Sequence, residues 1–325
     1  MGLSIWIIDD EWSNYNIEEK LLKEELKDCT IYYSKLNYAN DLKKIGSKVD
    51  AVIVQISVNV SKEMIDKLTK CKIISVYGTG YNNVDVKYAA KKNIKIGYIP
   101  GYCAEDIADY VIGSIFYFNK NYGCFKKEIC ENQWGAQVIS KPVRRVNTLK
   151  LFILGFGKIG QAVAGRAKAL NIEVLAYSPH LTEENAKKLG VKKVDINEGL
   201  KEADFLSVHS VYTKETENLL SYEDFKFMKK TAYLINTSRG RVINQKDLIK
   251  AVKENIICGA MLDVLENEPP EVNDEVLHTE GIVITPHISY YSEEALNELQ
   301  YRAAKNVVKV LKIQEGADLV QSRIN

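Results

Sequence analysis

A glycine-rich turn between an apolar run and a helical pattern constrains this fold more than any other stretch of the chain. The apolar run from Leu149 to Leu154 is typical of a buried parallel strand, and it ends in Gly155-Phe-Gly157-Lys-Ile-Gly160. Residues 161–170 follow with helical periodicity, and residues 172–177 form a second apolar run. A strand, a G-x-G-x-x-G turn, a helix and a second strand together make up a dinucleotide-binding unit.

Each glycine of the turn has a physical role in this interpretation. Gly155 allows the tight turn, Gly157 has no side chain to keep a pyrophosphate off the backbone, and Gly160 lets helix and strand pack closely. The free N–H groups and positive dipole end of the helix, whose first turn contains Lys158 and Ile159, would bind the phosphates. A glycine pattern alone is weak, so an ordinary strand-to-helix turn remains the alternative.

The residue after the second strand bears on the choice of dinucleotide. An NAD site usually carries Asp or Glu there to bond the ribose hydroxyls, whereas this chain has Ser178. Serine is neutral and would not repel a 2′-phosphate, and His180, Lys187 and Lys188 follow downstream. We expect NAD with a weakened ribose contact, and Ser178 leaves NADP open as the alternative.

Composition excludes several classes of partner. A length of 325 residues fits one or two domains, and the net charge of +1 gives no reason to expect nucleic acid or an acidic membrane surface as a partner. The 6 cysteines are scattered without a C-x-x-C pair, which indicates reduced thiols in the cytoplasm. No signal region and no apolar run long enough for a bilayer is found, so we expect a cytoplasmic protein.

Apolar runs alternate with helical patterns in the first hundred residues, which predicts a parallel sheet covered on both faces. The predicted strands are residues 3–8, 30–33, 51–54, 72–76 and 95–99, and the predicted helices are residues 17–26, 61–68 and 86–91. The first strand ends in Asp9-Asp10-Glu11, as in response-regulator receiver domains. The third strand ends in Gln55, where a receiver needs a phosphoacceptor Asp, so the sequence disfavours the receiver hypothesis.

The pattern breaks at Pro100-Gly101, and residues 104–119 then predict a long helix. Residues 120–147 are predicted to be irregular; their Trp134 would pack either on a partner subunit or on the domain's own core. Further strands are predicted at the apolar runs 205–208, 232–236, 257–262 and 282–285, and a final helix after Ser292, to about Leu311.

We therefore predict an α/β fold with two doubly wound parallel-sheet domains. A Rossmann cofactor domain, residues 101–289, would be inserted into a flavodoxin-like substrate domain, residues 1–100 and 290–325. The cleft between the domains would hold the chemistry, and hinges near Pro100 and Ser289 would close it.

Two of the polar stretches that follow predicted strands suit an anion. The backbone N–H groups of Gly78-Thr79-Gly80 would hold a carboxylate, although the same sequence is typical of a tight turn. Arg239 lies among small residues in Asn236-Thr-Ser-Arg-Gly240. Its planar fork suits a carboxylate and a neighbouring carbonyl oxygen, with an exposed surface arginine as the alternative.

The other two stretches suit proton transfer. Asp263 ends a strand, and Glu268 is restricted by Pro269-Pro270, which suits a residue that orients another. A solvated acidic loop is the alternative. His287 follows a strand and a proline and changes charge near neutral pH, unless it is a structural histidine.

Together these residues form a mechanism for reducing a 2-keto acid. Nicotinamide would supply the hydride, and His287 would protonate the developing alkoxide. Glu268 would stabilise the imidazolium and fix its orientation. Arg239 would bind the substrate carboxylate and polarise the ketone, helped by the N–H groups of residues 78–80.

Five motifs in order resemble the D-isomer-specific 2-hydroxyacid dehydrogenases, a family that includes D-3-phosphoglycerate and D-lactate dehydrogenases and glyoxylate/hydroxypyruvate reductases. The motifs cover nearly the whole chain and are Gly78 to Asp85, Gly155 to Gly160, Asn236 to Gly240, Asp263 to Pro269, and Pro286-His287. The resemblance implies catalytic roles for Arg239, Glu268 and His287.

The resemblance also implies binding residues and a homodimer formed through the cofactor domain. Asp263 falls where the family contacts the nicotinamide amide, and Ser178 where the family has its ribose acid. The further cofactor contacts that the resemblance implies are His209, Thr216, Thr237, Ser238 and His287. The implied substrate contacts are Gln55, Gly78, Thr79, Gly80, Arg239 and Tyr290.

Two stretches, Pro100 to Asp109 and His287 to Glu294, resemble a phosphoglycerate dehydrogenase-like subgroup that is itself similar to C-terminal-binding-protein corepressors. Tyr290 stands where those corepressors carry Trp. Gln55 and Ile56 stand where phosphoglycerate enzymes often carry Arg, which favours a small, non-phosphorylated 2-keto acid. The alternative from another class is a nucleotide-sensing binding protein with vestigial catalysis, like the corepressors.

Overall fold

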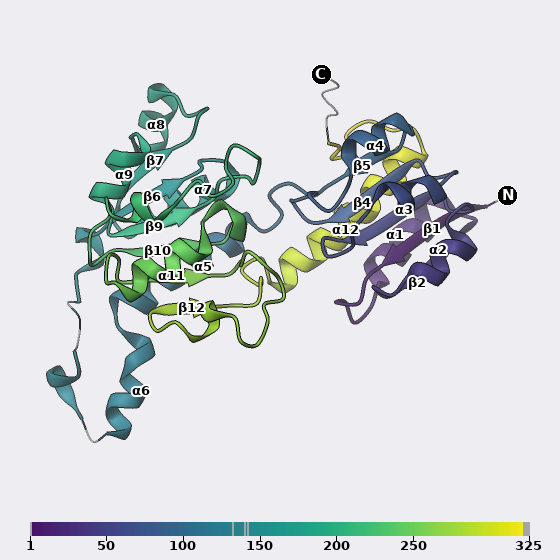
Figure 1. Ribbon diagram of the computed structural model, residues 1–325. Helices are drawn as coiled ribbons and strands as arrows, with labels where there is room; N and C mark the ends of the chain where they lie inside the picture. Colours follow the sequence, from purple (N-terminus) through teal and green to yellow (C-terminus); the bar gives the residue numbers. More distant parts are fainter. Residues whose placement is uncertain (1, 132, 140, 142, 321–325) are drawn as a thin grey trace. The chain divides into compact units, whose positions relative to one another are not determined.

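The computed structural model describes residues 2–131, 133–139, 141 and 143–320. Its internal contacts divide the chain into unit 1, residues 1–102 and 292–325, and unit 2, residues 103–291. Each unit contains one sheet whose strands are all parallel (Figure 1). The predicted fold class, two α/β domains with parallel sheets, is confirmed.

Unit 1 has the strand order β2-β1-β3-β4-β5, which is the flavodoxin-like order. Its strands are β1 (Leu3–Ile8), β2 (Cys29–Ser34), β3 (Ala51–Gln55), β4 (Ile73–Tyr77) and β5 (Lys95–Gly97). Its helices are α1 (Asn16–Leu26), α2 (Ala39–Ile45), α3 (Lys62–Lys67), α4 (Val86–Lys91) and α12 (Glu293–Leu311). Side chains of α1 and α12 share one hydrophobic core with the sheet, and side chains of α2, α3 and α4 share the other.

Unit 2 has the strand order β12-β11-β10-β9-β6-β7-β8, in which the chain changes direction across the sheet between β6 and β9, as in a Rossmann fold. Its strands are β6 (Lys150–Leu154), β7 (Glu173–Tyr177), β8 (Lys192–Lys193), β9 (Phe205–Val208), β10 (Tyr233–Asn236), β11 (Gly259–Leu262) and β12 (Ile282–Ile284).

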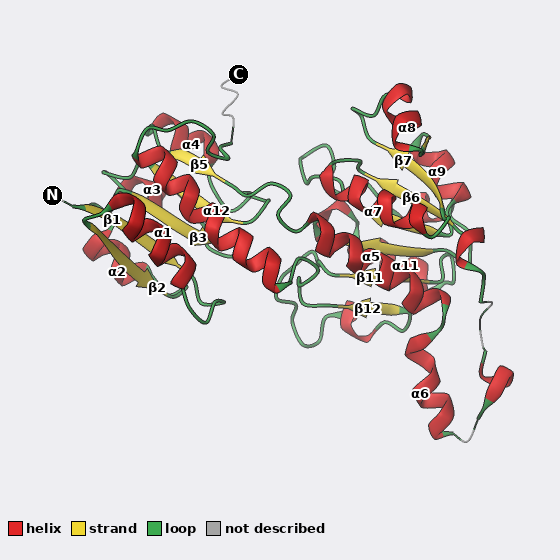
Figure 2. Cartoon of the chain, turned by 180° about the vertical axis from the view of Figure 1, so that it is seen from behind, coloured by secondary structure: helices red, strands yellow, loops and turns green. Residues whose placement is uncertain are grey.

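Helices cover both faces of this second sheet (Figure 2). α9, α10 and α11 contribute to the core on the face of Phe152 and Leu154. α5 and α7 pack against each other, and Gly160 of α7 lies against Ile153 on the opposite face. The helices are α5 (Ala104–Asn119), α6 (Tyr122–Cys130), α7 (Lys158–Ala169), α8 (Glu183–Leu189), α9 (Ile196–Glu202), α10 (Tyr222–Phe225) and α11 (Gln245–Lys253).

Helix α6 corrects one prediction. Residues 120–147 were expected to be irregular, but residues 122–130 form a helix that extends away from the sheet of its unit (Figure 1). Gly123, a poor helix former, weakens the helical signal of this segment in the sequence. Trp134 follows α6 with 76% of its surface exposed, so it does not cover the core of its own unit.

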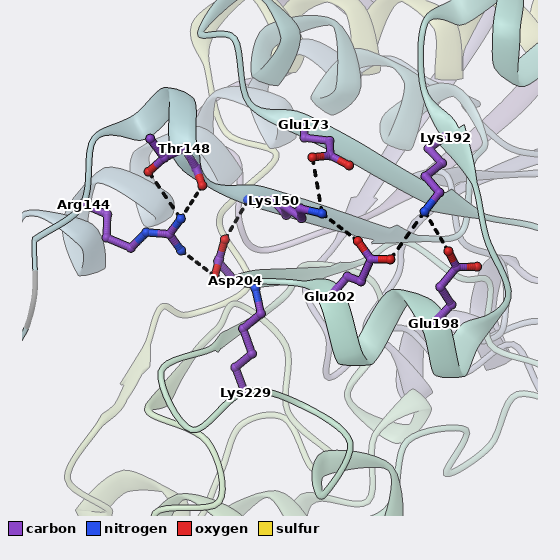
Figure 3. Close-up of polar contacts among 9 residues, drawn as sticks. All are labelled: Arg144, Thr148, Lys150, Glu173, Lys192, Glu198, Glu202, Asp204 and Lys229. Atoms are coloured by element: carbon purple, nitrogen blue, oxygen red, sulfur yellow. Dashed lines mark hydrogen bonds and ion pairs between the residues drawn. The ribbon is translucent and has the colours of Figure 1, made fainter.

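A charged network lies at the amino ends of the unit 2 strands (Figure 3). The buried Asp204 carboxylate accepts the Lys150 backbone N–H at 2.8 Å and pairs with Lys229 at 2.9 Å and Arg144 at 2.7 Å. The Lys150 ammonium pairs with Glu202 at 2.6 Å. Because the strands begin here, this network stabilises their positions at this edge of the sheet. The predicted site lies at the opposite edge, where the strands end.

A buried carboxyl group lies in unit 1. Glu18, in the first turn of α1, is fully buried, and its Oε1 accepts the Tyr77 hydroxyl at 2.5 Å. Burial raises the pKa of Glu18 to about 7, with a further rise from the charges of Asp9 and Glu19, although the Tyr77 hydrogen bond opposes the rise.

We expect Glu18→Gln to stabilise unit 1 at alkaline pH. The folded-state pKa of Glu18 is raised, so the protonated side chain stabilises the folded state. This contribution to the free energy of unfolding is fully present below the unfolded pKa near 4.5 and is lost as pH rises through about 7. Glutamine cannot ionise, so at pH 8–9 the variant should gain about 1–3 kcal/mol over the wild type, and almost nothing at about pH 4, below the unfolded pKa. Urea unfolding at both pH values measures the gain.

Glu19→Gln is the matched control, because Glu19 is the neighbouring carboxylate and its pKa is lowered by Lys23 and Tyr33. That variant should gain no stability at high pH. An equal response of both variants to alkaline pH would show that burial of Glu18 is not the cause.

Candidate active site

Six strands of unit 2 end at one edge of the sheet, and the register aligns their last residues. Leu154 pairs with Tyr177 and Val208, and Asn236 with Val208 and Leu262. Leu262 in turn pairs with Ile284 of β12. The next residues in each strand therefore leave the sheet side by side, and they are Gly155, Ser178, His209, Thr237, Asp263 and Thr285. Ligands of doubly wound sheets bind at this edge.

The glycine turn has the geometry of a phosphate cradle. Gly155 has φ +99°, a left-handed conformation, and a Cβ there would lie 2.5–2.6 Å from the backbone of His209 and Ser210. Gly157 is the residue before α7, and a Cβ there would meet nothing within 4 Å. A Cβ at Gly160 would lie 2.4 Å from the Gly155 carbonyl oxygen, so helix and turn are in close contact. The open N-terminus of the helix, starting at Lys158-Ile159, therefore suits an anionic group.

His209 follows β9 and is held by neighbouring hydroxyls. Its Nε2 lies 2.7 Å from the Ser207 hydroxyl, and its Nδ1 lies 3.5 Å from the Thr237 hydroxyl. Burial lowers the pKa of His209 to about 3, so the ring is neutral near pH 7 and hydrogen-bonds without carrying charge.

Two other predicted cofactor contacts use their hydroxyls within their own loops. Thr216 Oγ1 accepts the Thr213 backbone N–H and donates to the Val211 carbonyl oxygen, both at 2.7 Å. Ser238 Oγ donates to the Asn236 side chain at 2.8 Å. These bonds shape the loops after β9 and β10.

The predicted acid–base pair is formed within unit 2. His287 Nδ1 lies 2.6 Å from Glu268 Oε2, and Glu268 Oε1 accepts the Leu265 backbone N–H at 2.8 Å. Burial raises the pKa of Glu268, but the hydrogen bond and charge of His287, with smaller contributions from Leu265 and Arg239, outweigh it and hold the pKa below its usual value. An ionised Glu268 accepts a hydrogen bond from Nδ1–H, which leaves Nε2 of the ring to exchange a proton with a ligand.

Arg239 belongs to the same site, because its positive charge contributes to the lowered pKa of Glu268. Its guanidinium also donates to the Ser238 carbonyl oxygen at 2.7 Å. A Cβ on the following Gly240 would lie 2.0 Å from the Leu265 backbone, so only glycine lets the loop that carries Glu268 approach β10 this closely. Residues 239, 268 and 287, distant in sequence, are thus brought together.

Asp263 is 1% exposed and holds the loop that carries His287. Its Oδ1 accepts the Thr285 hydroxyl at 2.6 Å and the Ile288 N–H at 2.8 Å, and its Oδ2 accepts the Ser289 N–H at 2.9 Å. His287 itself has φ +52°, a conformation that costs a residue other than glycine about 1–2 kcal/mol. These bonds offset that cost and also tie Ser289 to unit 2.

One further contact in this loop has no signal in the sequence. The Tyr110 hydroxyl, from α5, lies 2.6 Å from the Thr285 hydroxyl. Tyr110 belongs to the helical pattern of residues 104–119, in which nothing distinguishes it from a packing residue.

Other predicted substrate residues belong to unit 1. Thr79 donates its hydroxyl to the Ile99 carbonyl oxygen at 2.9 Å, and within the described chain the backbone N–H groups of Thr79 and Gly80 have no partner. Gln55 is 2% exposed, and its Nε2 is buried without a hydrogen-bond partner among the described residues. Tyr290, in unit 2, lies beside Tyr291 with ring centroids 6.4 Å apart.

Two kinds of feature are absent from the described residues, a membrane-spanning helix and a metal-binding cluster. No helix there is both long and apolar enough to cross a membrane. No group of three or more His, Cys, Asp or Glu side chains in that part of the chain is arranged to hold a metal ion.

Comparisons with known proteins show the family that the chain resembles. The family model "D-isomer specific 2-hydroxyacid dehydrogenase, NAD binding domain" matches residues 112–289. A protein of Staphylococcus haemolyticus (strain JCSC1435) with the provisional name 2-hydroxyacid dehydrogenase is 36% identical over 262 residues, which are 80% of this chain and 82% of the relative.

Solved structures of similar proteins cover nearly the whole chain. D-lactate dehydrogenase from Aquifex aeolicus, complexed with NAD and lactic acid, is 26% identical with a TM-score of 0.83 and 95% coverage of both chains. An acyclic imino acid reductase in complex with NADPH and D-Arg is 25% identical with a TM-score of 0.84, and the match covers 98% of this chain and 100% of that one.

Proposed function

The chain belongs to the D-isomer-specific 2-hydroxyacid dehydrogenase family, and from this premise we propose that it transfers hydride between a nicotinamide dinucleotide and a small 2-keto or D-2-hydroxy acid. The observation that carries the proposal is the 2.6 Å contact between His287 Nδ1 and Glu268 Oε2, at the strand ends that also hold the glycine turn.

The residues of unit 2 fit a dinucleotide. The open N-terminus of α7 and the unobstructed Gly157 suit the pyrophosphate, and Ser178, the residue after β7, is proposed to bind the ribose. His209, Thr237 and Asp263 leave the neighbouring strands at the same edge and would line the remainder of the site. When bound, the nicotinamide supplies or accepts the hydride.

In the proposal each catalytic side chain has one task. His287 donates a proton from Nε2 to the substrate oxygen during reduction and takes it back during oxidation. Glu268 holds Nδ1 and stabilises the imidazolium. Arg239 binds the substrate carboxylate with its planar fork, and the free N–H groups of Thr79 and Gly80 in unit 1 are proposed to help. Tyr290 is proposed to line the substrate site, and Gln55 has the least support because its side chain is buried.

The substrate proposed is small and carries no phosphate group, since Gln55 and Ile56 stand where relatives that act on phosphoglycerate often have Arg. Units 1 and 2 are proposed as the substrate and cofactor domains. Hinges are proposed near Pro100 and after Ser289, because Ser289 is bound to Asp263.

Steady-state oxidation of NADH and NADPH against a panel of 2-keto acids tests the function. We expect turnover with at least one small 2-keto acid. Tight cofactor binding with no turnover across the panel would contradict the proposal and favour the alternative, a nucleotide-sensing binding protein like the corepressors. The pairing of His287 with Glu268 supports the enzyme over this alternative.

NAD is the proposed cofactor, and NADP stays a second candidate because the residue after β7 is Ser178 rather than an acid. The NADPH-bound relative supports testing both.

Ser178→Asp should shift the cofactor preference towards NADH. A carboxylate after β7 would repel a 2′-phosphate and bond the ribose hydroxyls, so kcat/KM with NADPH should fall by about 10–10³-fold while kcat/KM with NADH is kept or rises. Ser178→Asn introduces a side chain of the same size as aspartate but without its charge, so it separates the effect of side-chain shape from that of charge repulsion. It should reduce NADPH use less. Equal losses with both cofactors would contradict a ribose contact at this position.

A homodimer formed through unit 2 is proposed as well. Large apolar side chains are exposed on α6 and the segment that follows it, and they are Tyr122, Ile129, Trp134, Ile139 and Val143. Such a concentration marks an interaction surface. Light scattering of the purified chain would contradict the dimer if it gave the mass of a monomer.

The cytoplasm is the proposed location, supported by the 6 cysteines, which are scattered along the chain without a C-x-x-C pair. Cell fractionation tests it, and recovery of the protein outside the cytoplasmic fraction would contradict it.

A further inference from the structure

The loop that carries His287 depends on a short chain of hydrogen bonds. His287 donates its backbone N–H to the carbonyl oxygens of Asp263 and Thr285, at 2.9 and 3.0 Å. The Asp263 carboxylate accepts from Thr285 on one side of His287 and from Ile288 and Ser289 on the other. The His287 backbone is therefore held from both sides by one buried side chain.

The direction of the hydrogen bonds at Thr285 follows from counting protons. The Thr285 hydroxyl has one proton and donates it to Asp263 Oδ1 at 2.6 Å. The Tyr110 hydroxyl lies 2.6 Å from the same Thr285 oxygen, which has no second proton to give. Tyr110 must therefore be the donor in that contact, and the chain runs from Tyr110 through Thr285 to Asp263.

Tyr110 is suited to be a permanent donor. Burial raises the pKa of its hydroxyl to about 12, and the nearby negative charge of Asp263 adds to the rise. The phenol thus stays protonated through the physiological range. It comes from α5, which begins at Ala104, directly after the chain enters unit 2, whereas residues 285–289 precede the point where the chain leaves it.

We propose that Tyr110 is a positioning residue whose hydroxyl, through Thr285 and Asp263, fixes the backbone of residues 285–289 and so directs the His287 ring towards Glu268. This inference rests on the proposed function, because it assigns to Tyr110 a part in aligning the acid–base pair. It goes beyond that function by connecting α5 to the catalytic histidine.

Tyr110→Phe tests the proposal, because it removes the hydroxyl and keeps the ring. We expect kcat for keto-acid reduction to fall by about 3–10-fold, the loss of one neutral hydrogen bond, with KM for NADH unchanged. Thr285→Val should cost about 10–100-fold, since it also removes the bond to the Asp263 carboxylate. The double variant should be no worse than Thr285→Val alone, because Tyr110 acts only through Thr285.

Two matched variants separate positioning from packing. Thr285→Ser restores the hydroxyl and should recover wild-type kcat. Tyr117→Phe makes the same change on the same helix, at a hydroxyl without a hydrogen-bond partner in the described structure, and should leave kcat unchanged. If Tyr110→Phe does not fold, the Thr285→Val and Thr285→Ser pair decides the question.

A proton NMR signal provides a readout independent of turnover. The proton between His287 Nδ1 and Glu268 Oε2 should give a far-downfield resonance in the wild type, identified by its loss in His287→Asn. It should broaden or disappear in Tyr110→Phe and Thr285→Val and persist in Thr285→Ser and Tyr117→Phe.

An unchanged resonance and unchanged kcat in Tyr110→Phe would overturn the inference. If the wild-type protein reduces no 2-keto acid, the proposed function fails, while the resonance still decides whether Tyr110 positions His287.

Discussion

His287→Asn should lower kcat for 2-keto-acid reduction by about 10²–10⁴-fold, the usual contribution of a general acid–base group. Asparagine tolerates the left-handed backbone at residue 287, and its amide nitrogen takes the place of Nδ1 in the bond to Glu268. It has no titratable nitrogen in place of Nε2, so only proton exchange is removed. Stopped-flow reduction of a 2-keto acid measures the loss of kcat, and fluorescence titration with NADH measures cofactor binding.

NADH binding by His287→Asn should be close to that of the wild type, because the glycine turn and α7 are untouched. His278→Asn is the matched control, since His278 bonds the Val272 carbonyl oxygen within an exposed segment of the same unit and precedes the start of β12. It should keep full activity. Turnover of His287→Asn at the wild-type rate would remove His287 from the mechanism.

The buried strands were predictable because they are continuous apolar runs between polar segments. β9 has the predicted bounds, 205–208, and β6, residues 150–154, begins one residue after the predicted run of 149–154. β8 could not be predicted, because Lys192-Lys193 is a two-residue charged edge that pairs only with β7. α7 begins at Lys158, within the glycine motif, because Gly157 ends the turn and the helix uses the rest of the motif as its first turn.

The candidate site was predictable to the extent that strand ends meet at one edge of a parallel sheet. Arg239, Asp263 and His287 each follow an apolar run, so the order of the parallel strands predicts that these three residues lie close together. Contacts made by side chains from helices gave no comparable signal. Tyr110 and Thr285 are separated by 175 residues, and Glu18, at an acidic helix start that usually faces solvent, is instead bonded to Tyr77 in the core.

Arg239→Gln should lower kcat/KM for the keto acid by about 10²–10⁴-fold, the loss of two charge-assisted hydrogen bonds to a carboxylate. Arg239→Lys keeps the charge and loses the planar fork, so its loss should be smaller, about 10–10²-fold. In both variants the rise in KM for the keto acid should exceed any change in the Kd for NADH. Steady-state kinetics with varied keto acid and saturating NADH measure this.

Arg239→Gln should also change the pH dependence of activity. The Arg239 charge helps to lower the pKa of Glu268 against the opposing effect of burial. Without it that pKa moves upward, so the ionised Glu268 that orients His287 is lost at a higher pH as the solution is acidified. Arg241→Gln removes an exposed arginine two positions along the chain and should change neither kcat/KM nor the pH profile. An Arg239→Gln profile that coincides with the wild type would show that the guanidinium does not act on Glu268, and an unchanged KM would show that it does not bind the substrate carboxylate.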